Sequence, residues 1–215
     1  DPDRETIQWF ASVDAVLQQS FSDPNVVILL RSDKAIACHV SHETHIGMPE
    51  DRFCHHQGLI TKSEIRSIVL SKLCLVRPDH LLWDIGAGSG SVSIEASQLI
   101  PSGRVYAIEK DPGRISDINT NVSRFGCSNI KVISQAFPRG IQDLETPDRI
   151  FIGGGGRSLD QVISAACDSL VETGVIVVNT VLLETLATAI EQLAQKGFSP
   201  KVVQVQVSRS KAMPF

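Results

Sequence analysis

The most constraining feature of this 215-residue sequence is the alternation of short apolar runs with helical faces from Thr61 onward. Five runs are almost uninterrupted: LLWDIGA, RVYAIEK, IKVISQA, RIFIGG and VIVVNTV. Between them, apolar residues recur at helical spacing, as in Ile115, Ile118, Val122 and Phe125. This alternation predicts an α/β fold, a doubly wound and mostly parallel sheet with helices on both faces. A sixth run, KVVQVQV, alternates apolar and polar residues and predicts an antiparallel edge strand.

The chain before Thr61 follows a different pattern. A helix is predicted over residues 6–19 and a strand over NVVILL. We interpret residues 1–31 as the C-terminal remnant of a preceding domain. Residues 32–57, which are polar and rich in histidine, are interpreted as a linker, and residues 58–215 as the α/β domain. The first residue is Asp1 rather than Met, so we expect a fragment of a longer protein.

Composition excludes several classes of protein. The formal net charge is −4, which argues against a broad nucleic-acid-binding surface. No apolar run approaches the roughly 20 residues that span a bilayer, so we expect no membrane association. The five cysteines are dispersed without a CxxC pair, which is typical of reduced thiols in a cytoplasmic protein.

A glycine-rich turn follows the first apolar run, in the stretch LLWDIGAGSGSVSIEA. Gly86, Gly88 and Gly90 form a G-x-G-x-G pattern between a predicted strand and a predicted helix. Bare backbone at a helix N-terminus lets a cofactor approach closely. The dinucleotide fingerprint G-x-G-x-x-G would need a glycine where this chain has Ser91. Ser91 at that position counts against a standard dinucleotide, and the pattern indicates a nucleoside cofactor.

Two acidic residues flank this turn. Asp84 precedes it, where a carboxylate would repel a pyrophosphate but attract a sulfonium or an amino group. Glu109 ends the second apolar run, where a carboxylate can accept hydrogen bonds from ribose hydroxyls. Asp84 favours S-adenosylmethionine over NAD, whereas Glu109 supports either nucleoside.

The motifs DIGAGSG and AIEKDP resemble class I S-adenosylmethionine-dependent methyltransferases. More narrowly, GLITKSEIRSIVL, IFIGGGG and NTVLLE resemble the precorrin-6Y methyltransferase family of cobalamin biosynthesis, whose members methylate a corrin precursor and decarboxylate it. In fused members a methyltransferase domain precedes this one, and the join looks like GMPEDRF. The resemblance covers about residues 48–209. It implies a tetrapyrrole substrate rich in carboxylates and a homo-oligomeric assembly.

The resemblance also assigns cofactor-binding roles. It implies that Thr61 lies near the cofactor, that the glycine turn holds the methionine part, that Glu109 holds the ribose and that Ala136 borders the adenine. The position before Ala136 is often acidic in such enzymes, whereas this chain has Gln135. The predicted cofactor-binding residues are Thr61, Asp84, Gly86, Ala87, Gly88, Ser89, Gly90, Glu109, Gln135 and Ala136.

The substrate implied by the resemblance needs cations that bind carboxylates. Arginines suit this role because the guanidinium matches a carboxylate in geometry. The run GGGG at residues 153–156 leaves room for a large flat molecule, and it replaces the Asn/Asp-Pro-Pro-aromatic motif of many methyltransferases that act on nitrogen. No catalytic acid or base is predicted. The predicted substrate-binding residues are Arg66, Arg114, Gly154, Arg157 and Arg209.

Three further expectations concern local structure. Thr61 and Glu64, in TKSE, form a predicted capping box at a helix start. The cluster of cysteines and histidines between residues 38 and 56 matches no standard zinc spacing, so we predict a solvated linker and no metal site. Class I methyltransferases place a seventh strand after the sixth, and this chain is expected to lack it, so the sixth strand should pair poorly or find the edge of another chain.

Three alternatives stay open at this point. The chain could be a class I methyltransferase for RNA or protein, against which the glycine run and the net acidity count mildly. It could be an NAD-dependent oxidoreductase, against which Asp84 and Ser91 count. It could also be a non-catalytic interaction domain that binds no nucleoside.

Overall fold

The computed structural model describes residues 10, 15–16, 18–20, 44–56, 58–154 and 156–209. The chain divides into two compact units, residues 1–38 and residues 39–215. The helix predicted over residues 6–19 falls largely outside the described residues, and the strand NVVILL falls wholly outside them. The sheet and its helices belong to the second unit.

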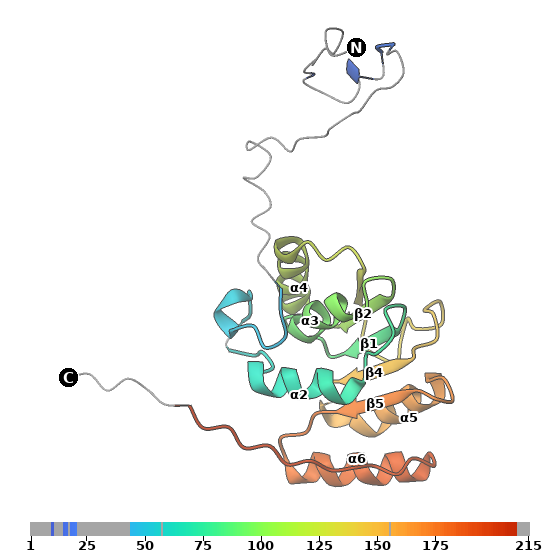
Figure 1. Ribbon diagram of the computed structural model, residues 1–215. Helices are drawn as coiled ribbons and strands as arrows, with labels where there is room; N and C mark the ends of the chain where they lie inside the picture. The colour runs from blue at the N-terminus through green and yellow to red at the C-terminus, as the bar shows by residue number, and fades with distance from the viewer. Residues whose placement is uncertain are drawn as a thin grey trace, which may run out of the picture. The chain divides into compact units, whose positions relative to one another are not determined.

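A parallel sheet of five strands forms the centre of this unit (Figure 1). The strand order is β3-β2-β1-β4-β5, and all four pairings are parallel. This arrangement confirms the predicted α/β fold and the first five predicted strands. Their bounds are β1 Leu81–Ile85, β2 Arg104–Glu109, β3 Ile130–Ser134, β4 Arg149–Ile152 and β5 Val175–Val178.

Helices pack on both faces of the sheet because successive strand residues point to opposite sides. Trp83, Ile108 and Ile150 pack with residues of α5 and α6 on one face. Leu82 and Phe151 pack with residues of α2 and α3 on the other. The helices are η3 Glu50–Arg52, α2 Ser63–Leu73, α3 Ser91–Leu99, α4 Pro112–Phe125, η4 Gly156–Ser158, α5 Leu159–Ser169 and α6 Leu183–Gln195.

Local signals in the sequence fix the ends of α4. The side chain of Asp111 accepts a hydrogen bond from the backbone N–H of Arg114 at 3.0 Å, and Pro112 occupies the first helical position. Both features are typical of a helix start. Gly126 ends the helix with a φ of 65°, which glycine adopts without a Cβ penalty.

The segment ahead of α2, residues 44–56 and 58–62, packs along the domain, and we call it the N-terminal strap. Met48 and Phe53 are buried, and both carboxylate oxygens of Glu95 accept strap amides, from Gly47 at 2.8 Å and Met48 at 2.9 Å. The expectation of a solvated linker is therefore wrong for this part of residues 32–57. Two apolar anchors and hydrogen bonds to distant helices, which the local sequence does not reveal, hold it in place.

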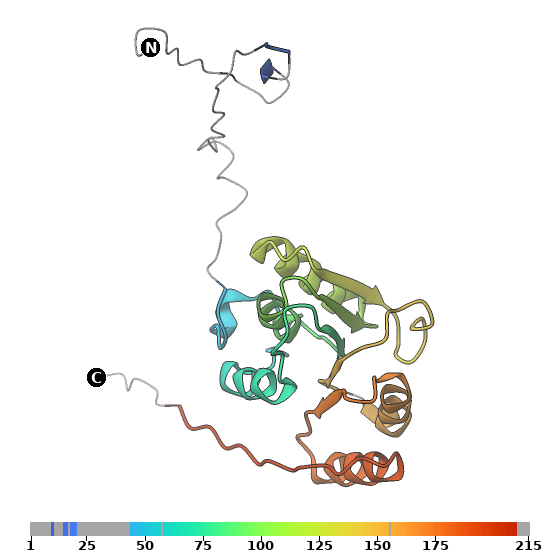
Figure 2. The ribbon, with the colours of Figure 1, turned by 45° about the vertical axis from the view of Figure 1, so that its right-hand side comes forward.

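The predicted edge strand KVVQVQV does not form. Residues 201–209 are exposed and belong to no strand, and they leave α6 as an extended segment (Figure 2). Arg209 then pairs with Glu50 and Glu64 beside the start of α2. The alternating pattern is real, but no neighbouring strand pairs with it in the described chain. Within that same part of the chain, no helix is long and apolar enough to cross a membrane.

Candidate functional site

The glycine turn connects β1 to α3 at the carboxyl edge of the sheet. Gly86, Gly88 and Gly90 all have positive φ, at 73°, 60° and 73°. A side chain on Gly86 would lie 2.9 Å from the carbonyl oxygen of Gly154, and one on Gly90 would lie 3.1 Å from Cγ2 of Ile118. A side chain on Gly88 would meet no protein atom nearer than 4.0 Å. Gly86 thus allows close packing against the backbone of Gly154 and Gly90 against the side chain of Ile118, whereas Gly88 faces open space that a ligand can enter.

Asp84 is the next-to-last residue of β1 and is completely buried. Its Oδ2 accepts a hydrogen bond from Ser93 Oγ at 2.6 Å, whereas Oδ1 has no hydrogen-bond partner. Burial, reinforced by the nearby charge of Glu109, raises the pKa of Asp84 to about 7. A buried carboxylate oxygen without a partner fits a site for a cationic ligand group.

Glu109 ends β2 directly beside the glycine turn. Its Oε2 accepts the N–H of Gly88 at 3.0 Å, and its Oε1 accepts the N–H groups of Lys110 and Asp111. These bonds hold the carboxylate in one orientation, and each oxygen retains acceptor capacity for a ligand hydroxyl. Arg114 Nη1 lies 3.9 Å from Glu109 Oε2, so this predicted substrate residue stands beside the predicted ribose acid.

The remaining members of the turn are held by the backbone of β2 and by α4. The N–H groups of Gly86 and Ala87 both donate to the carbonyl of Ile108, at 2.9 and 3.1 Å. Ser89 is buried, and its carbonyl accepts from Asn121. Ala87 and Ser89 therefore shape the turn through their backbones.

Gln135 and Ala136 follow β3, at the same carboxyl edge as Glu109, because Glu109 and Ser134 are register partners. Both residues are exposed. Gly140 folds back onto Gln135, since a side chain there would lie 2.8 Å from Gln135 Cγ. Their adenine contact stays a prediction.

The predicted capping box at Thr61 is wrong. Helix α2 begins at Ser63, and Lys62 occupies the cap position without a side-chain hydrogen bond. Instead, Glu50 Oε1 from η3 accepts the N–H of Ser63 at 2.8 Å. The strap supplies the cap that local sequence assigned to Thr61, which is a partly buried residue whose carbonyl accepts from Arg66.

Arg66 is unavailable as a substrate clamp, so that prediction is wrong. It is completely buried, and its Nε donates to Glu95 Oε1 at 2.7 Å. Its other nitrogens donate to the carbonyls of Thr61 and Met48. An arginine on a helical face gave no signal of this burial, because its acceptors come from distant segments.

The other predicted substrate residues do not form one cluster. Arg209 is half-exposed but engaged by two carboxylates, and its guanidinium lowers the pKa of both Glu50 and Glu64 to about 2. Gly154 is exposed beside Gly86, and Arg157 belongs to η4. The glycine turn and the GGGG run therefore meet at one edge of the sheet, whereas Arg209 lies at the start of α2.

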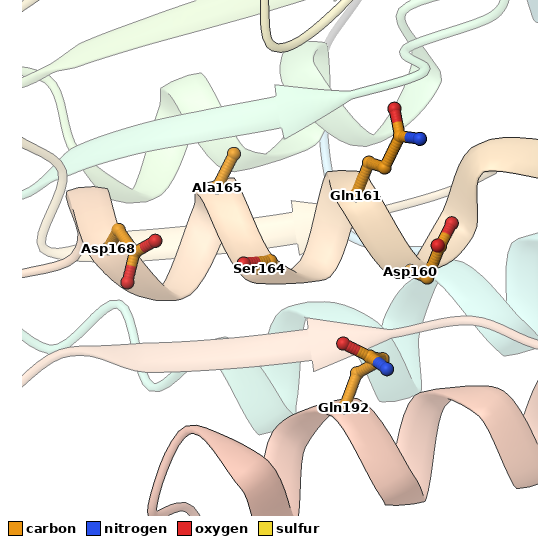
Figure 3. A pocket seen from close by; sticks show the side chains of 6 residues that line it. All are labelled: Asp160, Gln161, Ser164, Ala165, Asp168 and Gln192. Atoms are coloured by element: carbon orange, nitrogen blue, oxygen red, sulfur yellow. The ribbon is translucent and has the colours of Figure 1, made fainter.

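A separate hollow of about 320 Å³ lies between α5 and α6 (Figure 3). None of the predicted site residues lines it. Its lining residues are Asp160, Gln161, Ser164, Ala165, Asp168 and Gln192.

The cysteines and histidines between residues 38 and 56 are predicted to form no metal site. Cys38, His39 and His42 lie outside the described residues, and among those that are described no group of three or more His, Cys, Asp or Glu residues could hold a metal ion.

Comparison with known proteins identifies the family. The model of the precorrin methyltransferase domain matches residues 51–214. The chain belongs to the precorrin methyltransferase family. The residues matched by the family model therefore include the second part of the strap and the whole sheet.

Named relatives agree with this membership. The chain is 38% identical to a probable cobalt-precorrin-6B C(15)-methyltransferase (decarboxylating) of Pyrobaculum calidifontis, over 76% of this chain and 84% of the relative. It is 37% identical to a precorrin-6Y C(5,15)-methyltransferase [decarboxylating] of a Sinorhizobium species, over 75% of this chain but 38% of that longer protein. The crystal structure of precorrin-6Y C5,15-methyltransferase from Geobacter metallireducens is similar with a TM-score of 0.75 and 44% identity, over 77% of this chain and 88% of that one.

Two contributors to the site were missed from sequence: Ser93, which donates to Asp84, and Asn121, which donates to the carbonyl of Ser89. Both are buried and polar, and each acts through a residue on a neighbouring element. One signal was present for Asn121. It lies four residues after Asp117 on α4, beside the apolar face of Ile118, Val122 and Phe125, where polar residues need partners.

Proposed function

We propose that this chain methylates carbon in a precorrin, with S-adenosylmethionine as methyl donor and with decarboxylation of an acetate side chain, in cobalamin biosynthesis. Membership of the precorrin methyltransferase family carries this proposal. The glycine turn between two buried carboxylates, Asp84 and Glu109, supports it from the chemistry of the site. Relatives named as decarboxylating precorrin methyltransferases support the substrate class.

The residues of the turn fit S-adenosylmethionine. The unpartnered Oδ1 of Asp84 suits the amino group of the methionine part, and Gly88 leaves open space above the turn. Glu109, fixed by the N–H of Gly88, would accept the ribose hydroxyls. Gln135 and Ala136 would border the adenine. A pyrophosphate at this turn would face the carboxyl group of Asp84, which disfavours NAD, whereas Glu109 suits the ribose of either nucleoside.

When bound, this cofactor supplies an electrophilic methyl group. The acceptor carbon of a precorrin is already nucleophilic through the conjugated macrocycle, so the protein mainly has to hold the two reactants in line. Loss of carbon dioxide leaves an electron pair that enters the macrocycle. Consequently, the chain needs no strongly basic side chain at the reacting carbon, and we assign none.

The substrate side is proposed at the GGGG run, because Gly153 and Gly154 lie beside the glycine turn. Arg114 and Arg157 are the proposed carboxylate partners, and Arg209 is a weaker one because Glu50 and Glu64 already engage it. A cytoplasmic location, a homo-oligomeric state and the absence of nucleic-acid and membrane partners remain predictions. Size-exclusion chromatography with light scattering tests the oligomer.

The first test is calorimetric titration of the purified chain with S-adenosylhomocysteine, with NAD as a parallel ligand. We expect micromolar binding of S-adenosylhomocysteine alone. Glu109→Gln should weaken this binding about tenfold, because an amide accepts ribose hydrogen bonds less strongly than a carboxylate. Glu145→Gln, on an exposed residue near the opposite edge of the sheet, is the matched control and should bind like the wild type.

The alternatives predict other outcomes. Binding of NAD alone would indicate an oxidoreductase, and binding of neither ligand would favour a non-catalytic domain. Methylation of RNA or protein, without turnover of a precorrin, would overturn the substrate assignment while leaving the cofactor in place.

A further inference from the structure

Asn121 on α4 joins the N-terminal strap to the glycine turn. Its side chain is completely buried. Oδ1 accepts the N–H of Cys54 at 2.7 Å, and Nδ2 donates to the carbonyls of Cys54 at 2.8 Å and Ser89 at 2.9 Å. Both amide hydrogens are used, and the partners fix which atom is oxygen and which is nitrogen. One side chain therefore holds two segments that are distant in sequence.

We infer that Asn121 is a positioning residue that sets the glycine turn for cofactor binding. The inference rests on the proposed function, because the turn matters as a binding element only if a nucleoside cofactor occupies it. It assigns a role to a residue that touches neither reactant and that acts through the backbone of Ser89.

The geometry of the peptide group explains how one hydrogen bond can set the turn. The carbonyl of Ser89 and the N–H of Gly90 belong to one planar unit and point in opposite directions. Fixing the carbonyl therefore fixes the N–H, which donates to Ala87 at 2.8 Å and closes the turn. Gly88 lies between these two bonded points and faces the open space.

The same helix supports the turn and the strap at neighbouring points. Ile118, one helical turn before Asn121, packs against Gly90. Asp117 Oδ2 lies 2.5 Å from Nδ1 of His56, and Arg124 donates to the carbonyl of Arg52 at 2.7 Å. These two contacts hold the strap on α4 without reaching the turn. Among the hydrogen bonds described for α4 side chains, those of Asn121 alone reach both segments.

A matched control is available in Asn129. Its Nδ2 donates to the carbonyls of Ser97 and Ile100, at 3.2 and 2.9 Å, near the C-terminal end of α3. Asn121 and Asn129 thus both tie two backbone carbonyls. The first acts just before the start of α3, in the glycine turn, and the second acts at the opposite end of the helix.

The test compares Asn121→Ala with Asn129→Ala in the full chain, by calorimetry with S-adenosylhomocysteine well below both melting temperatures. We expect both variants to melt earlier than the wild type, because each leaves backbone carbonyls unsatisfied. Asn121→Ala should raise the Kd about tenfold or more, whereas Asn129→Ala should stay within about threefold of the wild type. Amide hydrogen exchange should accelerate at residues 86–90 in Asn121→Ala alone.

Asn121→Ser serves if the alanine variant fails to fold. Its hydroxyl can still donate one hydrogen bond, so we expect a Kd between those of the wild type and the alanine variant. Equal Kd values for the Asn121 and Asn129 variants, or unchanged exchange at residues 86–90, would overturn the inference. Failure of the wild type to bind S-adenosylhomocysteine would instead overturn the proposed function, so the two failures are distinguishable.

Discussion

The two halves of the sheet are built differently. In the half that carries the glycine turn, all five residues of β1 are buried, as are Val105 to Glu109 of β2. Seven residues of α3 are buried, and four of them are polar or charged: Ser91, Ser93, Glu95 and Ser97. In the other half, every residue of β5 is partly exposed, and Ala189 is the buried residue of α6.

This difference indicates that the two halves contribute differently to the stability of the domain and to the shape of the turn. The first half encloses polar groups that must be satisfied internally, and these groups fix the backbone of a small turn. Each half ends in an edge strand, β3 or β5, but the second half also has a peripheral helix and an extended segment, and its pair of Asp168 and Lys196 lies at the surface. A substitution should therefore cost more in the first half than its counterpart in the second.

The largest expected effect comes from the ion pair of Arg66 and Glu95, in which both side chains are fully buried. Glu95→Ala leaves the guanidinium of Arg66 without its carboxylate and the amides of Gly47 and Met48 without acceptors. We expect the free energy of unfolding to fall by about 3–5 kcal/mol, measured by urea denaturation.

Asp168→Ala in the second half is the matched control. In its pair with Lys196, the Asp168 side chain is mostly exposed, so losing the pair should lower the free energy of unfolding by at most about 1 kcal/mol. Equal losses for Glu95→Ala and Asp168→Ala would remove the contrast between the two halves.

The next effect is the dependence of stability on pH through Asp84. Burial raises its pKa from 3.8 to about 7, so between these values the folded protein holds a proton that the unfolded chain has lost. Stability should therefore fall as the pH rises through this range, by an amount on the order of 4 kcal/mol, and level off above about 7. Urea midpoints across this range for the wild type and Asp84→Asn measure the effect.

Asp84→Asn cannot ionise and keeps an oxygen that can accept from Ser93. Its profile should lack this decrease. If the wild type and the variant have parallel profiles, then another group controls the decline and Asp84 is not the buried acid described above.

A smaller difference in stability is expected between alanine variants at two glycines, both of which have a positive φ. Gly86 has a φ of 73° and Gly197, after α6, has a φ of 82°. Alanine at either position should cost about 1–2 kcal/mol from backbone strain. At Gly86 the new Cβ would also lie 2.9 Å from the carbonyl oxygen of Gly154, whereas at Gly197 it would meet nothing within 4 Å.

We therefore expect Gly86→Ala to lose about 1–3 kcal/mol more than Gly197→Ala, measured by urea denaturation. Gly86→Ala should also weaken binding of S-adenosylhomocysteine, whereas Gly197→Ala should not. If both variants bind equally well, then the close approach of the turn to the GGGG run is unimportant for the site.

The fold was predictable because its signals are local. The five uninterrupted runs became β1 to β5, and Asp111, Pro112 and Gly126 fix α4 through neighbouring backbone. The positions of Asp84 and Glu109 beside the glycine turn were predictable because both residues lie near strand ends, and their roles in cofactor binding stay predictions. The predictions failed where distant partners decide, as for Arg66, which is buried against Glu95, and Thr61, which loses its capping role to Glu50.

The run KVVQVQV is a second case in which the local sequence did not decide the structure. Its alternation favours a strand, but a strand needs a neighbour, and the described chain supplies none for residues 201–207. Pattern alone gives the preference of a segment, whereas hydrogen-bond partners decide whether it becomes part of a sheet.

The sequence by itself determined the parallel α/β sheet, the place of the glycine turn and the two acids beside it, because period and strand ends are local properties. Only the tertiary structure decided which polar residues hold that turn. Asn121 reaches Ser89 and Cys54 across 32 and 67 positions of sequence, and Arg66 is paired with Glu95 inside the domain. The physical reason is that a buried polar group takes whatever partner the packed helices bring to it, and sequence spacing does not encode that partner.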